Sequence, residues 1–119
     1  MKMPEDTKEK TEIDYSNSNF VKDIKEILFV CTEDLHALSI GQTRQATKEQ
    51  IEGTIIPEMN RLLEMAQNNE LPPISQRWIL SSAYITRDWN WDIWSNDKLN
   101  KKLPELDDKY RHFLNEERQ

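Results

Sequence analysis

The chain has 119 residues, of which 36% are hydrophobic and 32% are charged, and its formal net charge at pH 7 is −6. This length is that of one compact domain, and the balance of apolar and charged residues excludes a wholly disordered chain. Only two glycines are present, which favours helices, because strand-rich domains of this size need glycine in their turns and bulges.

Residues 1–17 predict a flexible charged tail, and a single helical domain is expected over residues 18–119. The tail consists largely of Lys, Glu, Asp and Thr, with Ile13 and Tyr15 as apolar anchors. From Ser18, which is expected to cap a helix, apolar residues recur with the spacing of one helical stripe. Gly41 follows at the position of a C-terminal cap. We therefore predict a helix over residues 19–39.

A second helix is predicted over residues 47–68. Thr47 and Gln50 have the reciprocal spacing of a capping box, and apolar residues recur behind them at helical spacing. Pro57 falls inside this helix, where it removes an amide donor and crowds the carbonyl group of Gly53. We expect a kink or a break at that point.

Two further helices are predicted in the second half of the chain. Pro73 suits the first position of a helix, which we expect over residues 73–87. The last helix is expected to begin at residue 99, or at Pro104 if the proline delays its regular part, and to end at residue 117. The predicted fold class is therefore all-α, as a small four-helix up-and-down bundle. The sequence leaves a homodimer open, because kinked helices can complete their core in a dimer as well as in a monomer.

Residues 27–31 offer an alternative, because they favour a strand and a helix could follow at Thr32, as in an α/β fold. This segment also resembles the strand that enters the phosphate loop of low-molecular-weight tyrosine phosphatases, with Cys31 at the nucleophile position. Ala37, however, occupies the position of the arginine that grips phosphate in that family. Both readings rank below a core cysteine on a helix, since no other run in the sequence looks like a buried partner strand.

The sequence contains no recognisable catalytic, metal or cofactor site, so we expect a protein that is not an enzyme. Glu33 and His36 have the Glu-x-x-His spacing of carboxylate-bridged metal bundles, but Lys109 stands where the other histidine, His112, would need a carboxylate. A metal-dependent bundle enzyme using Glu33, His36 and His112 is the alternative, and it requires these side chains to converge.

The distribution of charge favours a protein partner over nucleic acid. Residues 1–70 contain 8 basic and 14 acidic side chains, whereas residues 71–119 contain 8 of each. A negative field repels phosphates and attracts basic surfaces, so a DNA-binding regulator using residues 42–50 as a helix-turn-helix connection is a second alternative only. No apolar run reaches the length of a membrane span, and the single cysteine and polar N-terminus predict a cytoplasmic protein.

The most unusual feature of the sequence is a cluster of tryptophan and aspartate residues after the third predicted helix. The candidate interface is Asp88, Trp89, Trp91, Asp92 and Trp94. Tryptophan is enriched at the energetic centres of protein interfaces, although these rings could instead close one end of a small bundle. The sequence thus predicts a small acidic protein-binding module of inhibitor, immunity or regulatory type, whose partner has a basic surface.

Overall fold

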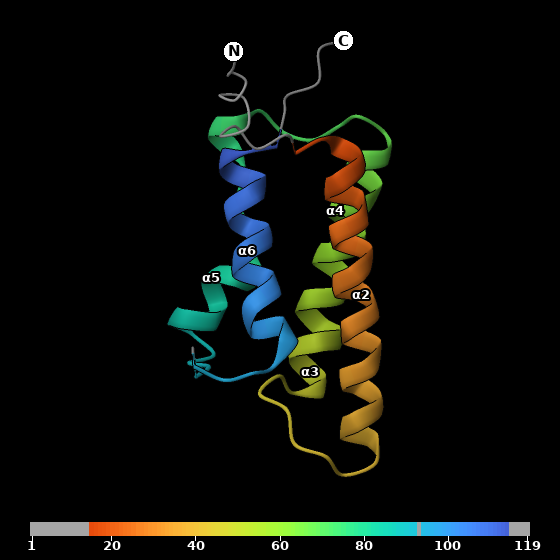
Figure 1. The fold of residues 1–119 in the computed structure, drawn as a ribbon, viewed down its shortest axis with the longest axis vertical. Helices are drawn as coiled ribbons and strands as arrows, with labels where there is room; N and C mark the ends of the chain where they lie inside the picture. Colours follow the sequence, from red (N-terminus) through yellow and green to blue (C-terminus); the bar gives the residue numbers. More distant parts are fainter. Residues whose placement is uncertain (1–14, 93, 115–119) are drawn as a thin grey trace, which may run out of the picture.

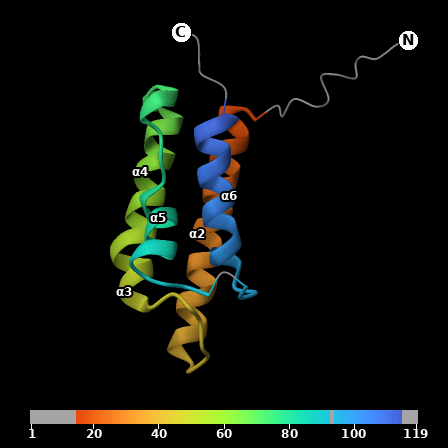
Figure 2. The same ribbon diagram turned by 90° about the vertical axis from the view of Figure 1, so that its left-hand side faces the viewer.

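The computed structural model describes residues 15–92 and 94–114 and shows an all-α bundle. The elements are α2 (Asn17–Ser39), α3 (Lys48–Gln50), the π-helix η1 (Ile51–Ile55), α4 (Ile56–Gln67), the 3-10 helix η2 (Ile74–Gln76), α5 (Leu80–Arg87) and α6 (Lys98–His112). α2 runs down the molecule, a composite helix of α3, η1 and α4 runs back up, the segment with η2 and α5 descends, and α6 ascends beside α2 (Figure 1). α2 packs against both α4 and α6, and α5 packs against α6 (Figures 1 and 2). The predicted all-α bundle is confirmed.

The first helix begins earlier than predicted. Ser16, rather than Ser18, is its N-cap, and the Ser16 hydroxyl accepts a hydrogen bond from the amide of Asn19 at 3.2 Å. The helix ends as predicted at Ser39, and Gly41 follows with a φ of 87°, which suits glycine. There the amide of Gln42 donates to the carbonyl of Ala37 at 2.9 Å, which closes a Schellman motif.

Residues 27–31 lie within α2, so the α/β alternative is wrong. Most of the predicted tail, residues 1–14, lies outside the described residues. Tyr15, which belongs to the predicted tail, is only 4% exposed and forms a bridge with Leu114. Its hydroxyl donates a 2.6 Å hydrogen bond to Asp23, and burial together with this carboxylate raises the pKa of Tyr15. The folded unit therefore includes Tyr15.

The second helix has a π-helical turn just before Pro57, where a kink or a break was predicted. The capping box is present, with the Gln50 amide 3.0 Å from the Thr47 hydroxyl and the Thr47 amide 3.1 Å from the Gln50 side chain. The amide of Ile56 then donates to the carbonyl of Ile51, five residues earlier. The change from π to α register falls at Pro57, which has no amide to continue the ladder.

The predicted helix over residues 73–87 is wrong in its first half. Only η2 and the short α5 are helical, and the backbone at Arg77 and Ile79 is extended. We call residues 77–79 the extended strap, and tertiary contacts hold it. The Arg77 side chain donates to the carbonyls of Pro72 and Leu114, at 2.9 and 3.0 Å. The amide of Ile79 donates to Asp107 of α6 at 2.8 Å.

The last helix begins at Lys98, well before Pro104, and ends at His112 rather than at residue 117. The amide of Leu114 folds back onto the carbonyl of Lys109 at 2.8 Å, and the bridge to Tyr15 then takes the backbone out of the helix. Residues 115–119 lie outside the described residues.

One hydrophobic core runs along the bundle and is built from α2, η1, α4, α5 and α6, together with residues of the connections. Its centre includes the stacked rings of Phe20 on α2 and Tyr110 on α6, whose centroids are 4.9 Å apart. No helix in the described part of the chain has the length and apolar character needed to cross a bilayer.

Candidate functional site

The loop between α5 and α6 carries the tryptophans, and it is bound tightly to the connection between α2 and α3. We call residues 88–92 and 94–97 the tryptophan loop. The side chain of Gln45 accepts from the amide of Asp92 at 2.6 Å and donates to the carbonyl of Asp92 at 3.1 Å. The Asn100 side chain donates to the same carbonyl at 2.8 Å, and the Asp97 carboxylate accepts from the backbone amide of Gln45 at 2.7 Å. The tryptophan loop is therefore held at Asp92, in its middle, and at Asp97, its last residue.

Two of the five candidate interface residues are part of the core packing. The rings of Trp89 and Trp91 stack with centroids 5.5 Å apart. The ring of Trp89 also packs against that of Tyr84 on α5, with centroids 5.3 Å apart. Trp91 is only 7% exposed, and its indole nitrogen donates to the Gln50 side chain at 3.2 Å. These two rings close one end of the bundle, so Trp91 presents little surface to a partner.

Trp94, in contrast, is 84% exposed. Its backbone amide donates to the carboxylate of Asp92 at 3.0 Å, and the amide of Ser95 donates to the Asp92 carbonyl at the same distance. Asp92 thereby holds the backbone amides of Trp94 and Ser95, while the indole of Trp94 stays exposed. Asp88, at the end of α5, is also exposed. We call Asp88, Asp92 and Trp94 the Trp94 surface.

The residues that hold this surface were not identified from the sequence. Gln45 and Asn100 contact the tryptophan loop, and Gln45 is separated by 47 residues from Asp92 and by 52 from Asp97. No local pattern marks such a contact. The capping box at Gln50 was recognised, but not the second role of that side chain as acceptor for Trp91.

Cys31 is fully buried on α2 and is a poor nucleophile in the folded protein. Burial, together with the nearby carboxylate of Asp34, raises the pKa of this thiol from 9.0 to about 12. Asp34 is itself buried and forms a 3.1 Å ion pair with Arg44. Burial raises the pKa of Asp34, while Arg44 acts in the opposite direction. The ion pair with Arg44 thus explains how the carboxylate of Asp34 is accommodated in a buried position.

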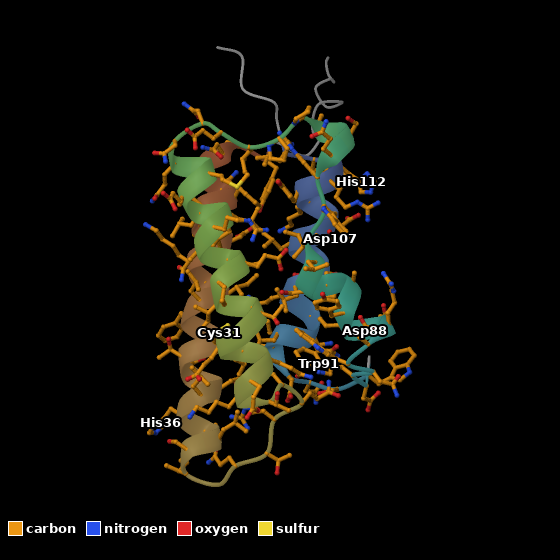
Figure 3. The ribbon with its side chains drawn as sticks, turned by 180° about the vertical axis from the view of Figure 1, so that it is seen from behind. Cys31, His36, Asp88, Trp91, Asp107 and His112 are labelled. Carbon is orange, nitrogen blue, oxygen red and sulfur yellow. The ribbon has the colours of Figure 1, made fainter. Side chains whose placement is uncertain are left out.

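The three side chains of the metal alternative do not converge. His36 lies near one end of the molecule and His112 near the other (Figure 3). Glu33 pairs with Lys98 at 3.7 Å, and His112 lies 3.8 Å from Asp108. Across residues 15–92 and 94–114, no group of three or more His, Cys, Asp or Glu side chains is arranged to hold a metal ion. These three residues cannot form one site.

The connection proposed for DNA binding does not have helix-turn-helix geometry. Residues 40–47 join α2 to a composite helix that runs antiparallel to it (Figure 1). A helix-turn-helix motif instead joins two helices that cross at a wide angle through a short turn. The arrangement is that of a helical hairpin.

No protein-family model, curated protein or solved structure matches the chain. The arguments about function therefore rest on the geometry of its own residues. Among the described residues, five large hydrophobic side chains are exposed, and Trp94 is the most exposed of them. The others are Phe29, Ile40, Ile74 and Trp78.

Proposed function

We propose that this protein is a non-catalytic binding module, of inhibitor, immunity or regulatory type, that acts by covering part of another protein's surface. The Trp94 surface is the proposed contact. The observation that supports it best is that Trp94 is 84% exposed while its backbone amide is bound by Asp92. Burial of an exposed indole gains apolar contact area, and a fixed backbone lowers the entropy lost on binding.

Charge favours a basic partner. Asp88 and Asp92 are exposed on the same loop as Trp94, and the whole chain has a net charge of −6. Two carboxylates on the same loop as an exposed indole are complementary to a tryptophan-binding pocket that is flanked by lysine or arginine. Such complementarity increases the rate of association and the discrimination between partners more than it increases affinity.

Affinity capture from the lysate of the cells that make the protein tests this proposal. We expect the wild-type chain to retain one basic protein in stoichiometric amount. Trp94→Ala should weaken its binding by about 2 kcal/mol or more, as for an interface hot spot. Phe29→Ala is the matched control, because it removes another exposed aromatic ring, 62% exposed, from α2. Equal retention by the Trp94→Ala protein would rule out the Trp94 surface as the contact.

A second copy of the chain as the partner would appear in light scattering as a dimer that Trp94→Ala converts to a monomer. Asp88→Asn tests the electrostatic part separately. We expect it to slow association at low salt and to have little effect at high salt, where charges are screened within a few ångströms.

A further inference from the structure

A groove between α5 and α6 is a second candidate binding site, separate from the Trp94 surface. It has a volume of about 470 Å³. Pro104, Asp107 and Arg111 line it from one face of α6, and Arg87 lines it from the end of α5. Trp78, on the extended strap that precedes α5, forms part of its wall.

The groove is positively charged in a protein that is negatively charged overall. Three arginines line it, Arg77, Arg87 and Arg111, against the single carboxylate of Asp107. Both oxygens of Asp107 have hydrogen-bond partners, since one accepts from the amide of Ile79 and the other lies 3.3 Å from Arg111. The local excess is therefore two positive charges in a chain of net charge −6.

The arginines differ in their freedom to bind a ligand. Arg77 is 7% exposed, and its donors hold backbone carbonyls. It supplies a fixed positive charge at the base of the groove. Arg87 is exposed, and the side chain of Arg111 is 48% exposed. Arg87 can turn toward a carboxylate, and Arg111 keeps further N–H donors beside the one that it gives to Asp107. Arginine binds a carboxylate with two parallel hydrogen bonds.

Trp78 gives the groove an apolar component. Its side chain is 59% exposed, although it lies next to the buried Ile79. An exposed indole beside two accessible arginines suits a ligand that carries both carboxylates and an apolar side chain. We propose that this groove binds an acidic segment of a partner protein, with an apolar side chain of that segment against Trp78 and its carboxylates on Arg87 and Arg111.

Charge complementarity favours an acidic peptide over nucleic acid as the occupant. A nucleic acid carries a continuous series of phosphates, which the negative field of the rest of the chain repels. A short peptide presents its few carboxylates only where the groove is positive. The apolar side chain of the peptide also packs against the indole of Trp78.

Fluorescence anisotropy with labelled peptides tests the proposal on the full chain. The probe is a short peptide of alternating glutamate and leucine, and the comparison is the same peptide with lysine in place of glutamate. We expect the glutamate peptide to bind and the lysine peptide not to bind. Affinity should fall as salt is raised, because the Debye length shrinks from about 10 Å at 0.1 M to about 3 Å at 1 M.

Matched variants locate the site. Trp78→Ala should weaken peptide binding about tenfold, which corresponds to about 1.4 kcal/mol, and Arg87→Glu should weaken it by about the same factor. Arg61→Glu, at an exposed position on α4, makes the same charge change elsewhere and should have little effect. Trp94→Ala should also leave peptide binding unchanged, which separates this site from the Trp94 surface. All four positions are exposed, so circular dichroism should show native helix content in each variant.

Three results would overturn the proposal. The first is no binding of the glutamate peptide at low salt. The second is binding that survives both Trp78→Ala and Arg87→Glu. The third is a single-stranded oligonucleotide that binds more tightly than the peptide and competes with it, which would assign the groove to nucleic acid instead.

Discussion

The carboxylate of Glu58 on α4 accepts two hydrogen bonds from Ser81 on α5, from its amide at 2.8 Å and its hydroxyl at 2.6 Å. The other oxygen of Glu58 accepts from the amide of Leu80 at 2.6 Å. α5 begins after Ile79, whose side chain cannot cap a helix, so a carboxylate from a different helix satisfies its first amides. Glu58 is buried, at 5% exposure. It therefore couples the position of α5 to that of α4.

Glu58→Gln should destabilise the protein by about 2 to 3 kcal/mol, because the amide group places a donor against backbone donors and removes a charge-assisted acceptor. Urea unfolding followed by circular dichroism measures the change. The control is Glu64→Gln, at an exposed position of the same helix, which should change stability by less than about 0.5 kcal/mol. A similar small loss for both variants would show that the cap contributes little.

Trp91 and Trp94 should respond in opposite ways to truncation. Trp91→Ala removes a ring that is 7% exposed and should cost about 3 kcal/mol or more of unfolding free energy. Trp94→Ala removes a ring that is 84% exposed and should cost less than about 0.5 kcal/mol. Thermal unfolding of the two variants checks this. A strongly destabilised Trp94→Ala protein would mean that the indole packs against the fold and does not face solvent.

The Cys31 thiol should not react with a disulfide reagent at about pH 8 in the folded protein and should react fully in denaturant, because only the thiolate is nucleophilic. Its pKa is raised from 9.0 to about 12, so between these values the folded chain binds more protons than the unfolded chain. Stability should therefore fall as pH rises through this window. The urea midpoint should fall less steeply with pH for Cys31→Ala than for the wild type. Rapid reaction of the native thiol would contradict the burial of Cys31.

The two helical prolines should differ in cost. Pro104 lies inside α6, where it removes an i to i−4 hydrogen bond, so Pro104→Ala should stabilise the protein by about 1 to 3 kcal/mol. Pro57 stands where π register changes to α register, so Pro57→Ala should change stability by less than about 1 kcal/mol. Denaturant unfolding measures both. An equal gain from both substitutions would argue that the π turn does not accommodate Pro57.

Gln45→Ala should release the tryptophan loop, because it removes the side chain that both donates to and accepts from the backbone of Asp92. We expect hydrogen exchange at the amide of Asp92 to accelerate about tenfold or more, with a loss of stability of about 1 to 2 kcal/mol. Gln42→Ala, in the same connection, is the matched control and should leave exchange at Asp92 unchanged. Unaltered protection in Gln45→Ala would show that other contacts hold the loop.

The sequence predicted the long helices well, because each carries its own local signals. The apolar stripe of α2 ends before Gly41, and the capping box of Thr47 and Gln50 starts the second helix. These signals depend on residues three or four apart, and the structure confirms them. The start of α2 was placed two residues late, because Ser16 and Ser18 are equally good caps in isolation.

An all-α chain with two well-marked long helices and a tryptophan-rich connection could be predicted from local patterns, because helical periodicity and capping are local properties. Tertiary structure alone decided where the third helix begins, which tryptophans are buried, and which arginines meet Trp78. Arg77 and Ile79 are extended because their donors bind groups more than twenty residues away, Leu114 and Asp107. Trp91 is buried and Trp94 exposed for a similar reason. Gln50 binds the indole of Trp91 and Gln45 binds the backbone of the loop, and both are more than forty residues away in the sequence.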